Sequence, residues 1–425
     1  MSEGNQTALG IYVHVPYCIK KCRYCDFTSF EEAPRDCYFD GLAESIRSAA
    51  EKLGSGEVYG TINAVNLFEC SDRSRIPVDS VFFGGGTPSL ASAVQLGTVL
   101  RAVQDHFLLT EDAELTIEVN PETVTAEKAA ELKELGFNRV SIGVQSFDDR
   151  VLKALGRVHS ADRAREAFKT LRAAGFENIN LDLMLGVPMA SDDPESKQSG
   201  QSFDSWESTL EEALALRPEH LSFYSLQIEE GTPLYRDFAA GRVDISSWED
   251  NRRMYHLAVE LLKKNGYHHY EVSNAALPGF ECRHNLKYWT MRPYLGFGTS
   301  AHSFILVFSA DGRIRAAFRG EAAWRNTEHT VCNRNPSEAE FCSLKPESTS
   351  DLKGDFIFTQ LRLTAGLDTD LYRKLFGSDF SDDLKDEISR LTEEGYAEMS
   401  GVRLRLTPKG LDNTNPVMQC LLSGL

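Results

Sequence analysis

Six short apolar segments, each followed by a stretch with helical spacing of apolar residues, constrain the fold of this chain more than any other feature. The expected strands cover residues 11–15, 80–83, 114–119, 139–143, 178–185 and 220–226. Alternating strands and helices build a parallel sheet, because right-handed crossovers return each helix onto a sheet face. The sequence therefore predicts an α/β fold in which six strand–helix units form a barrel or a partial barrel.

Unusual polar and glycine residues fall at the carboxyl ends of these strands, which is the end where parallel barrels carry their active sites. They are a cysteine loop, Gly84 to Gly86, Glu118, Gln145, Asp182 and Ser225. Each has an ordinary alternative: a tight turn for the glycines, a helix-start charge for Glu118, and satisfied core groups for Gln145 and Asp182. Their coincidence across six strands nevertheless predicts a binding or active site at this end.

The cysteine loop contains Cys18, Cys22 and Cys25 in the spacing C-x3-C-x2-C. A [4Fe–4S] cluster normally takes four thiolates, whereas this loop offers three and has Phe27 at the fourth position. An iron left open in this way can chelate the amine and carboxylate of an amino acid, as in S-adenosylmethionine. The alternative is structural zinc, which takes four ligands, but the sequence has no second cysteine pair to complete them.

The cysteine spacing, with Tyr24 before the third cysteine, resembles the cluster loop of the radical SAM superfamily. The longer run YVHVPYC...CRYCDF is similar to the branch that contains the oxygen-independent coproporphyrinogen III oxidase (HemN) and the haem chaperone HemW. This resemblance implies a partial (β/α)6 TIM-like barrel. It also implies a [4Fe–4S] cluster held by Cys18, Cys22 and Cys25, and bound S-adenosylmethionine.

The same resemblance assigns contacts with S-adenosylmethionine to ten positions. The run FFGGGTPS matches the segment that binds the methionyl amine, and Glu118 matches a carboxylate that accepts hydrogen bonds from the ribose hydroxyls. Gln145, Arg157 and Asp182 match positions that contact S-adenosylmethionine in the oxidases, although a surface cation is the alternative for Arg157. The full set is Tyr12, Tyr24, Gly85, Gly86, Thr87, Glu118, Gln145, Arg157, Asp182 and Ser225.

A second motif, CRHNLKYW at residues 282–289, separates the two members of this branch. His284, Asn285, Tyr288 and Trp289 match the H-N-x-x-Y-W group of HemW, which the oxidase pattern lacks. Imidazole can coordinate haem iron while aromatic rings pack against the macrocycle. The alternative is that the motif only fixes a loop against the barrel edge. The resemblance favours haem binding.

The chain divides into four expected segments. They are a barrel with the cluster loop at 1–230, a barrel extension carrying the second motif at 231–307, a variable polar linker or insertion at 308–350, and a winged-helix-like α+β domain at 351–425. The last segment has helical patterns at 356–363, 371–376 and 384–394, followed by a two-strand piece at 397–406. Long connections are expected at 54–79 and 189–202.

Composition excludes several classes of partner and setting. The formal net charge of −18 disfavours nucleic acids. No apolar run approaches ~18 residues, so no integral membrane segment is expected. The N-terminus resembles neither a secretory signal nor a transit peptide. The cysteines outside the loop are scattered and do not form the pattern of a disulfide framework, which is typical of a reducing cytoplasm.

Three hypotheses for function follow. The first is a haem chaperone that binds haem, a [4Fe–4S] cluster and S-adenosylmethionine, passes haem to an unidentified acceptor protein and takes electrons from a reductant such as flavodoxin or ferredoxin. The second is a coproporphyrinogen III oxidase acting by radical decarboxylation, but Phe27 and the 17 residues before Cys18 depart from its pattern. The third is an interaction protein with a structural cluster. No catalytic residue is assigned.

Overall fold

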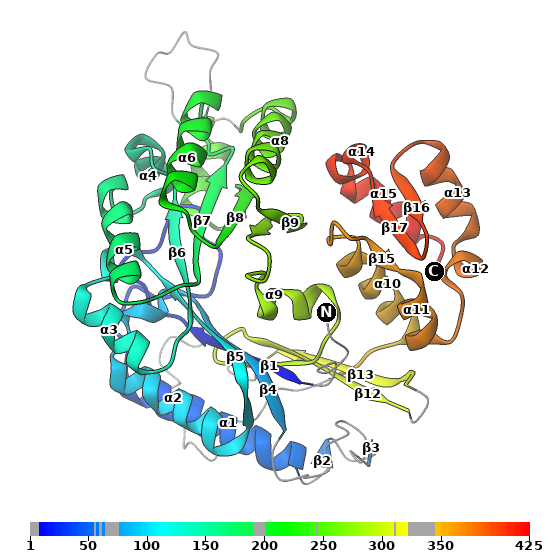
Figure 1. Ribbon diagram of the computed structural model, residues 1–425, viewed down its shortest axis with the longest axis horizontal. Coiled ribbons are helices and arrows are strands. Elements are labelled where there is room, and N and C mark those ends of the chain that lie inside the picture. Colours follow the sequence, from blue (N-terminus) through cyan, green and yellow to red (C-terminus); the bar gives the residue numbers. More distant parts are fainter. Residues whose placement is uncertain are drawn as a thin grey trace.

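The computed structural model describes residues 8–54, 57–58, 62–63, 76–189, 200–243, 245–309, 312–321 and 345–425. Within these residues a twelve-stranded sheet has the order β14-β13-β12-β11-β1-β4-β5-β6-β7-β8-β10-β9 (Figure 1). A three-stranded sheet lies in the C-terminal part. A hairpin of β2 (Glu57–Val58) and β3 (Ile62–Asn63) lies in the expected long connection after the first helix.

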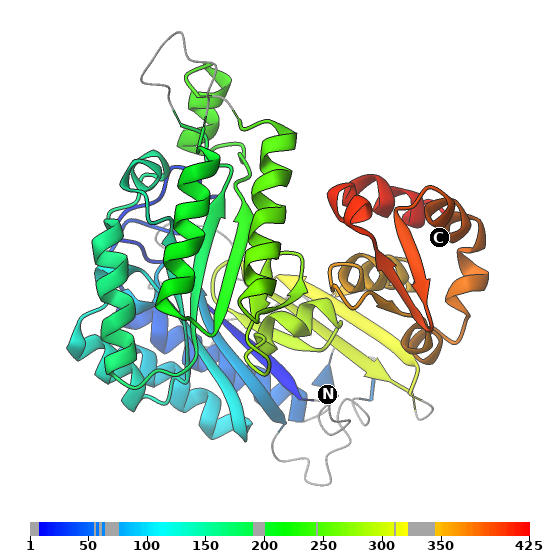
Figure 2. The ribbon, with the colours of Figure 1, turned by 45° about the horizontal axis from the view of Figure 1, so that its top comes forward.

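Six neighbouring parallel strands form the barrel part of the large sheet. They are β1 (Leu9–Val15), β4 (Pro77–Gly85), β5 (Leu108–Val119), β6 (Arg139–Gln145), β7 (Ile179–Leu185) and β8 (His220–Ser225). The helices that cover the outside are α1 (Asp36–Gly54), α2 (Ala93–His106), α3 (Ala126–Glu134), α4 (Asp149–Leu155), α5 (Ala161–Ala173), α6 (Phe203–Leu216) and α8 (Trp248–Lys264) (Figures 1 and 2). The predicted α/β partial barrel is confirmed.

Strand β1 shows how one strand serves both the core and the site. Ile11, Val13 and Val15 are fully buried in the main core between sheet and helices. Tyr12 and His14 alternate with them and line a pocket on the other face of the sheet. The apolar positions hold the strand in place, and the intervening positions present polar aromatic groups to the barrel interior.

The helices after the strands begin at side chains that accept backbone N–H groups. Ser92 accepts from the N–H of Gln95 at 3.2 Å, and the Gln95 side chain accepts from the N–H of Ser92 at 2.9 Å. Ser160 caps α5, and Ser202 caps α6 in the same way. Such caps stabilise a helix by about 1 kcal/mol each and fix where each loop at the carboxyl ends of the strands must stop.

The large sheet continues beyond β1 as an antiparallel extension. β11 (Tyr294–Phe297) pairs parallel with β1 and leads to β12 (His302–Phe308), β13 (Ile314–Glu321) and β14 (Lys345–Pro346). On the other edge lie β9 (His268–Glu271) and β10 (Asn274–Ala276). The stretch 308–350, expected to be a variable polar linker or insertion, thus contains β13 and β14 of the large sheet. Residues 322–344 and 190–199 lie outside the described residues.

Alternation explains why β13 is a strand despite its charge. Phe318 is buried, its neighbour Arg319 is partly exposed, and the Arg319 guanidinium lies 5.2 Å from the centre of the Phe304 ring on β12. The Arg319 side chain thus packs over the Phe304 ring without interrupting the pairing of β13 with β12.

The C-terminal part has its own core. The helices there are α10 (Thr349–Gln360), α11 (Thr369–Phe376), α12 (Phe380–Asp383), α13 (Lys385–Glu393), α14 (Pro408–Asp412) and α15 (Thr414–Leu422), and the strands are β15 (Leu367–Asp368), β16 (Ala397–Ser400) and β17 (Arg403–Leu406). Phe356, Tyr372 and Leu404 are fully buried among them. The predicted α+β unit with a hairpin is confirmed, whereas α12, α14 and α15 were not predicted.

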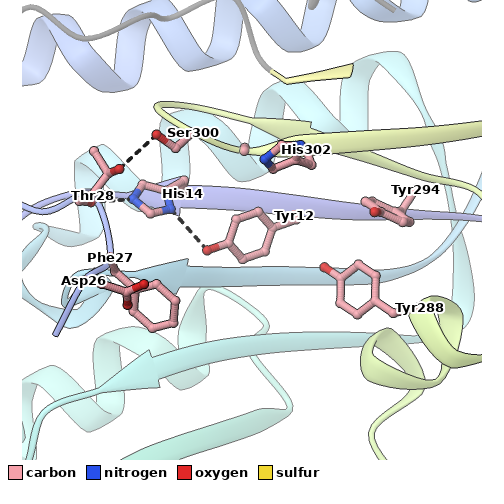
Figure 3. A pocket seen from close by; sticks show the side chains of 10 residues that line it. Tyr12, His14, Asp26, Phe27, Thr28, Tyr288, Tyr294, Ser300 and His302 are labelled. Carbon is pink, nitrogen blue, oxygen red and sulfur yellow. Dashed lines mark hydrogen bonds between the residues drawn. The ribbon is translucent and has the colours of Figure 1, made fainter. Parts of the chain in front are cut away.

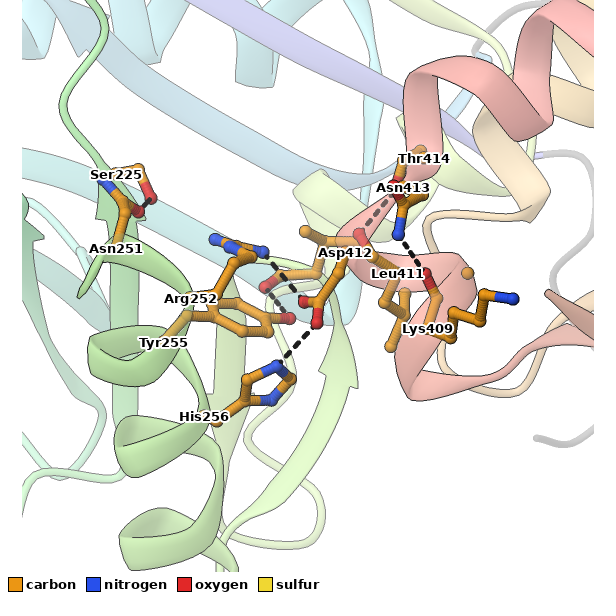
Figure 4. Close-up of polar contacts among 12 residues, drawn as sticks. Ser225, Asn251, Arg252, Tyr255, His256, Lys409, Leu411, Asp412, Asn413 and Thr414 are labelled. Carbon is orange, nitrogen blue, oxygen red and sulfur yellow. Dashed lines mark hydrogen bonds and ion pairs between the residues drawn. The ribbon is translucent and has the colours of Figure 1, made fainter. Parts of the chain in front are cut away.

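Side chains of α8 bind the C-terminal unit to the barrel (Figure 4). Asp412 accepts from His256 Nε2 at 2.9 Å and from Arg252 Nη1 at 3.4 Å. The Arg252 guanidinium also lies 4.5 Å from the centre of the Tyr255 ring. In the turn after β9, the N–H of Val272 donates to the Arg362 carbonyl at 3.0 Å, so backbone and side-chain contacts hold the two units together.

The structure shows the state of several cysteines outside the loop and the length and polarity of the helices. Cys37 in α1 is disulfide-bonded, a pairing that the scattered spacing of these cysteines did not predict. Cys282 and Cys420 are free thiols, while Cys70, Cys332 and Cys342 lie outside the described residues. Within the described part of the chain, every helix is too short or too polar to cross a bilayer.

Candidate functional site

The loop that carries the three cysteines is closed by backbone hydrogen bonds between its ends. Cys18 donates its N–H to the Phe30 carbonyl at 2.9 Å, and Phe30 donates to the Pro16 carbonyl at 2.7 Å. All three cysteines, Cys18, Cys22 and Cys25, are free thiols with partial exposure. The loop therefore presents three thiols at the carboxyl end of β1.

The glycine run after β4 holds the start of this loop. The N–H groups of Gly86 and Thr87 donate to the carbonyls of Val15 and Tyr17 at 2.9 and 2.7 Å. A Cβ atom on Gly86 would lie 2.7 Å from the Tyr17 carbonyl oxygen, so only glycine permits this approach. The run therefore joins the cysteine loop to the second strand of the barrel, in addition to forming a turn.

Hydrogen-bond donors point at two of the thiols. Thr87 Oγ1 lies 3.8 Å from Cys18 Sγ, and Arg157 Nη1 donates to Cys22 Sγ at 3.4 Å. Burial raises the pKa of the Cys25 thiol to about 11 and also raises the pKa of Cys18. A bound metal favours the thiolate over the thiol, and nearby donors stabilise the resulting anionic centre.

The number of thiols in the loop suits a cluster better than a structural zinc ion. Zinc needs four ligands around one point. A cubane instead takes each thiolate on a different iron, so the three partly exposed thiols of one loop fit a [4Fe–4S] cluster.

The structure places Arg157 beside the cysteine loop instead of on the open surface. Its Nη2 donates to the Gly143 carbonyl at 2.6 Å, and its Nε is buried without a hydrogen-bond partner in the described structure. Burial is the main cause that raises the pKa of the neighbouring Tyr24 phenol, and the charge of Arg157 opposes that rise. Tyr24, Arg157 and Cys22 thus lie together, and their roles toward S-adenosylmethionine and the cluster stay predictions.

Glu118 and Asp182 lie inside the barrel near its carboxyl end. Glu118 Oε2 accepts from the N–H of Gly85 at 3.1 Å, so this carboxyl is not a helix-start charge. Burial, and secondly the charge of Asp182, raise the pKa of Glu118 to about 8. Asp182 accepts from Ser141 Oγ at 3.0 Å and Asn180 Nδ2 at 2.8 Å, and burial raises its pKa as well.

Gln145 and Ser225 end β6 and β8. Gln145 has a left-handed backbone with φ of 67°, and its Oε1 accepts from the Tyr224 hydroxyl at 3.0 Å. A positive φ in a residue other than glycine is a strained state that occurs often at functional sites. Ser225 donates to Asn251 Oδ1 at 2.6 Å (Figure 4), so its hydroxyl is engaged by α8 and not by the other predicted residues.

The second motif forms α9 (Arg283–Trp289), which packs against β4 of the barrel. His284 is buried, and both of its ring nitrogens are engaged: Nδ1 lies 3.1 Å from Ser80 Oγ and Nε2 lies 2.9 Å from the Tyr288 hydroxyl. Coordination of haem iron by His284 would require one of these bonds to break. Its role as a haem ligand stays a prediction.

The other positions of α9 anchor it on both sides. Lys287 is buried, with Nζ 2.6 Å from Asp79 Oδ1. The Trp289 ring lies 4.6 Å from the Arg362 guanidinium, and its carbonyl accepts from Gln360 Nε2 at 2.9 Å. Asn285 is partly exposed on the same helix. The motif therefore links the barrel to the C-terminal unit.

A pocket of about 370 Å³ opens between the cysteine loop, β1, α9 and the turn from β11 to β12 (Figure 3). Its lining consists of Tyr12, His14, Asp26, Phe27, Thr28, Tyr288, Tyr294, Ser300, Ala301 and His302. Sequence reasoning singled out only Tyr12, Phe27 and Tyr288 of these. Three of the residues that were not predicted, Ser300, Ala301 and His302, lie in the run GFGTSAHSF. Small and polar residues follow a strand there, and this pattern could have indicated a site.

Comparison with known proteins places the chain in a family. Residues 12–196 match the Radical SAM superfamily, and residues 354–412 match the HemN C-terminal domain. The chain is 30% identical over 417 residues to the heme chaperone HemW of Bacillus subtilis, covering 97% of this chain and 99% of that one. It is 36% identical over 315 residues to HemW of Escherichia coli, covering 72% of each. The chain belongs to the HemW family of radical SAM proteins.

This membership confirms the predicted resemblance and has consequences for cofactors. The radical SAM superfamily implies a [4Fe–4S] cluster and S-adenosylmethionine in this HemW-family chain. The solved structure of coproporphyrinogen III oxidase (HemN) from Escherichia coli superposes with a TM-score of 0.74 at 20% identity, covering 99% of this chain and 91% of the other. At that identity the likeness establishes the fold alone.

We predict that replacing Cys18, Cys22 or Cys25 with Ala removes the cluster, because each thiolate holds a different iron and the loop contains no spare cysteine. Iron and sulfide counts after anaerobic reconstitution measure the effect. Cys420→Ala in the C-terminal unit is the control and keeps full counts. Full iron and sulfide in all three loop variants would end the assignment.

For Glu118, we predict that Glu118→Gln keeps the cluster and weakens S-adenosylmethionine binding by about 1–3 kcal/mol, the scale of a lost charge-assisted hydrogen bond. Because the pKa of Glu118 is raised to about 8, the carboxylate forms only as pH rises through that value. The affinity of the wild type for S-adenosylmethionine should therefore increase as pH rises through about 8, and Glu118→Gln should show no such increase. Anaerobic calorimetry measures both.

The exposed Glu122→Gln, four residues along the same loop, is the matched control for this experiment and should behave as wild type. Equal affinities and equal pH profiles for wild type and Glu118→Gln would show that Glu118 does not contact the nucleoside.

The buried pair under α9 gives a prediction of stability. Asp79→Ala leaves the Lys287 ammonium buried without its counter-ion and should lower the free energy of unfolding by about 3–5 kcal/mol. Asp112→Ala removes an exposed pair with Arg283 and should cost less than about 1 kcal/mol. Chemical denaturation measures both, and similar losses would contradict the buried role of the pair.

Proposed function

We propose that this protein is a haem chaperone, which binds haem and passes it to an acceptor protein. The observation that carries this proposal is the alignment of 97% of the chain with a relative named heme chaperone HemW, at 30% identity. Phe27 supports it, because it stands where the oxidase pattern has a fourth cysteine. The residues of the H-N-x-x-Y-W motif are all present as well.

The proposed arrangement assigns separate tasks to the residues at the carboxyl end of the barrel. Cys18, Cys22 and Cys25 would hold the cluster, which when reduced supplies an electron to S-adenosylmethionine. The amide of Gly85 already donates to Glu118, and this carboxylate would accept hydrogen bonds from the ribose hydroxyls. The Arg157 guanidinium lies against Cys22 and would balance negative charge on the thiolates.

The remaining positions would complete a nucleoside and methionyl site. Gly86 and Thr87 present backbone next to the cysteine loop. Tyr12 lies over the glycine run, where a Cβ atom on Gly84 would come within 3.1 Å of its ring. Tyr24, Gln145, Asp182 and Ser225 would bound the site at the ends of the other strands. These assignments rest on the match of motif positions and on their shared location in the barrel.

Partners follow from this chemistry. A cluster that donates single electrons needs a reductant, and a small flavodoxin or ferredoxin has the required chemistry. The haem acceptor is an apo-haemoprotein of the same compartment, which we propose to be the cytoplasm. The formal net charge of −18 makes nucleic acid an unfavourable partner.

The test is to purify the protein anaerobically, add haemin, and count iron, sulfide and haem on the same sample. We expect haem bound together with an intact cluster, and transfer of that haem to an added apo-haemoprotein. In parallel, coproporphyrinogen III with S-adenosylmethionine and a strong reductant should give no decarboxylated product. Absence of haem binding would overturn the proposal, and rapid decarboxylation would make the protein an oxidase.

A further inference from the structure

The pocket beside the cysteine loop has the chemical composition of a site for a flat aromatic ligand. Four aromatic rings line it, from Tyr12, Phe27, Tyr288 and Tyr294 (Figure 3). Phe27 is 62% exposed, so its ring is open to a ligand. A volume of about 370 Å³ falls within the range of small-molecule sites. The rings offer stacking surface, and the exposed Phe27 gains most from being covered.

Two histidines line this pocket, and they differ in what their rings already bind. His14 is buried, with Nδ1 3.2 Å from the Tyr12 hydroxyl and Nε2 2.8 Å from the Thr28 carbonyl. His302 is exposed, and neither ring nitrogen has a hydrogen bond within the described part of the chain. Of the two imidazoles lining the pocket, His302 has a ring nitrogen free to coordinate a metal.

The backbone of His302 is held firmly although its ring is free. A Cβ atom on Gly296 would lie 2.2 Å from the His302 carbonyl oxygen, so β11 and β12 pack together at the closest possible distance there. The N–H of Gly296 also donates to Ser303 Oγ at 2.9 Å. Ser300, whose φ of 58° is left-handed, has its hydroxyl 2.9 Å from that of Thr28. A fixed backbone reduces the entropy lost when the ring binds a ligand.

We propose that this pocket binds haem and that His302 is an axial ligand of the haem iron. The proposal rests on the haem-chaperone function proposed above and names the site of that function. The aromatic rings pack against the macrocycle, and a neutral imidazole nitrogen donates its lone pair to the iron. Transfer then exchanges the bond from His302 to iron for a bond from an acceptor's ligand, with no change in electron count.

The H-N-x-x-Y-W motif acts on this pocket through Tyr288. The Tyr288 hydroxyl is fixed by His284 Nε2 at 2.9 Å, and its ring meets Tyr294 edge-on with centroids 4.7 Å apart. His284 is therefore a positioning residue for the pocket wall, and Tyr288 is the member of the motif that contacts haem. Substitutions of His302 and His284 should therefore affect haem binding differently, because the first removes the iron ligand and the second only releases the Tyr288 ring.

The experiment titrates haemin into the anaerobically reconstituted full chain and records affinity and the Soret band. His302→Ala should shift the Soret band and weaken binding by more than about tenfold, since even losing a partner of a metal ligand commonly costs that much. Imidazole added to His302→Gly should restore the wild-type band. His268→Ala, on exposed β9 outside the pocket, is the matched control and should leave both readings unchanged.

Two further probes separate coordination from packing. Metal-free protoporphyrin IX should bind wild type and His302→Ala equally, because it has no iron to coordinate. Tyr288→Ala removes a ring from the pocket wall and should weaken the binding of haemin and of metal-free porphyrin alike, which a lost iron ligand would not do. The ligand assignment would be overturned if His302→Ala weakened the binding of metal-free porphyrin and of haemin equally. It would also be overturned if the Soret band shifted in His284→Gln but not in His302→Ala.

The outcomes also distinguish this inference from the function on which it rests. If wild type binds no haemin, the chaperone function fails. If wild type binds haemin and transfers it while His302→Ala has the same spectrum and affinity, the function stands and the site is overturned.

Discussion

The backbone contact between the cysteine loop and the glycine run is the constraint on which the site depends. Gly86 and Thr87 donate to carbonyls of the segment that leads from β1 into the loop. Because β1 and β4 are parallel neighbours, their carboxyl ends meet, and the two loops can share hydrogen bonds only if no side chain separates them. This contact fixes the three thiols relative to the strands that carry Glu118 and Asp182.

Polar groups inside the barrel add a second constraint. Ser141 and Asn180 lie in register on neighbouring strands and both bond Asp182, whereas Glu118 receives one backbone N–H. Burial raises the pKa of both carboxyls. The two carboxyls repel each other when both are ionised, and the charge of the buried Arg139 guanidinium opposes the rise of both pKa values. A cationic ligand such as a sulfonium nucleoside would relieve the repulsion further.

The sequence predicted the barrel well because its strands are continuous apolar runs. In β6, for example, Val140, Ile142 and Val144 are all fully buried, and such runs are visible without any long-range information. The cysteine spacing was equally local. Strand β13, within the expected linker or insertion at 308–350, was not predicted because its basic residues obscure a strand that is stabilised by its partner β12.

The bonding of the second motif and the pocket could not be predicted because both depend on distant segments. His284 meets Ser80, 204 positions earlier in the chain, and this contact occupies the ring nitrogen that the motif alone left available. The pocket draws its wall from the cysteine loop, β1, α9 and the turn before β12. Tyr12, Phe27 and Tyr288 lay in motifs that the sequence singled out, but no spacing rule connects these motifs to one another or to His302.

The segment Asp26 to Thr28 belongs to two sites at once. It follows Cys25 directly, and it also forms one wall of the pocket, tied through the Thr28 hydroxyl to Ser300. A substitution here must satisfy both the path of the loop and the shape of the wall. Substitutions at these three positions are therefore restricted by both sites. Engineering of the pocket shape would have to start from the opposite wall.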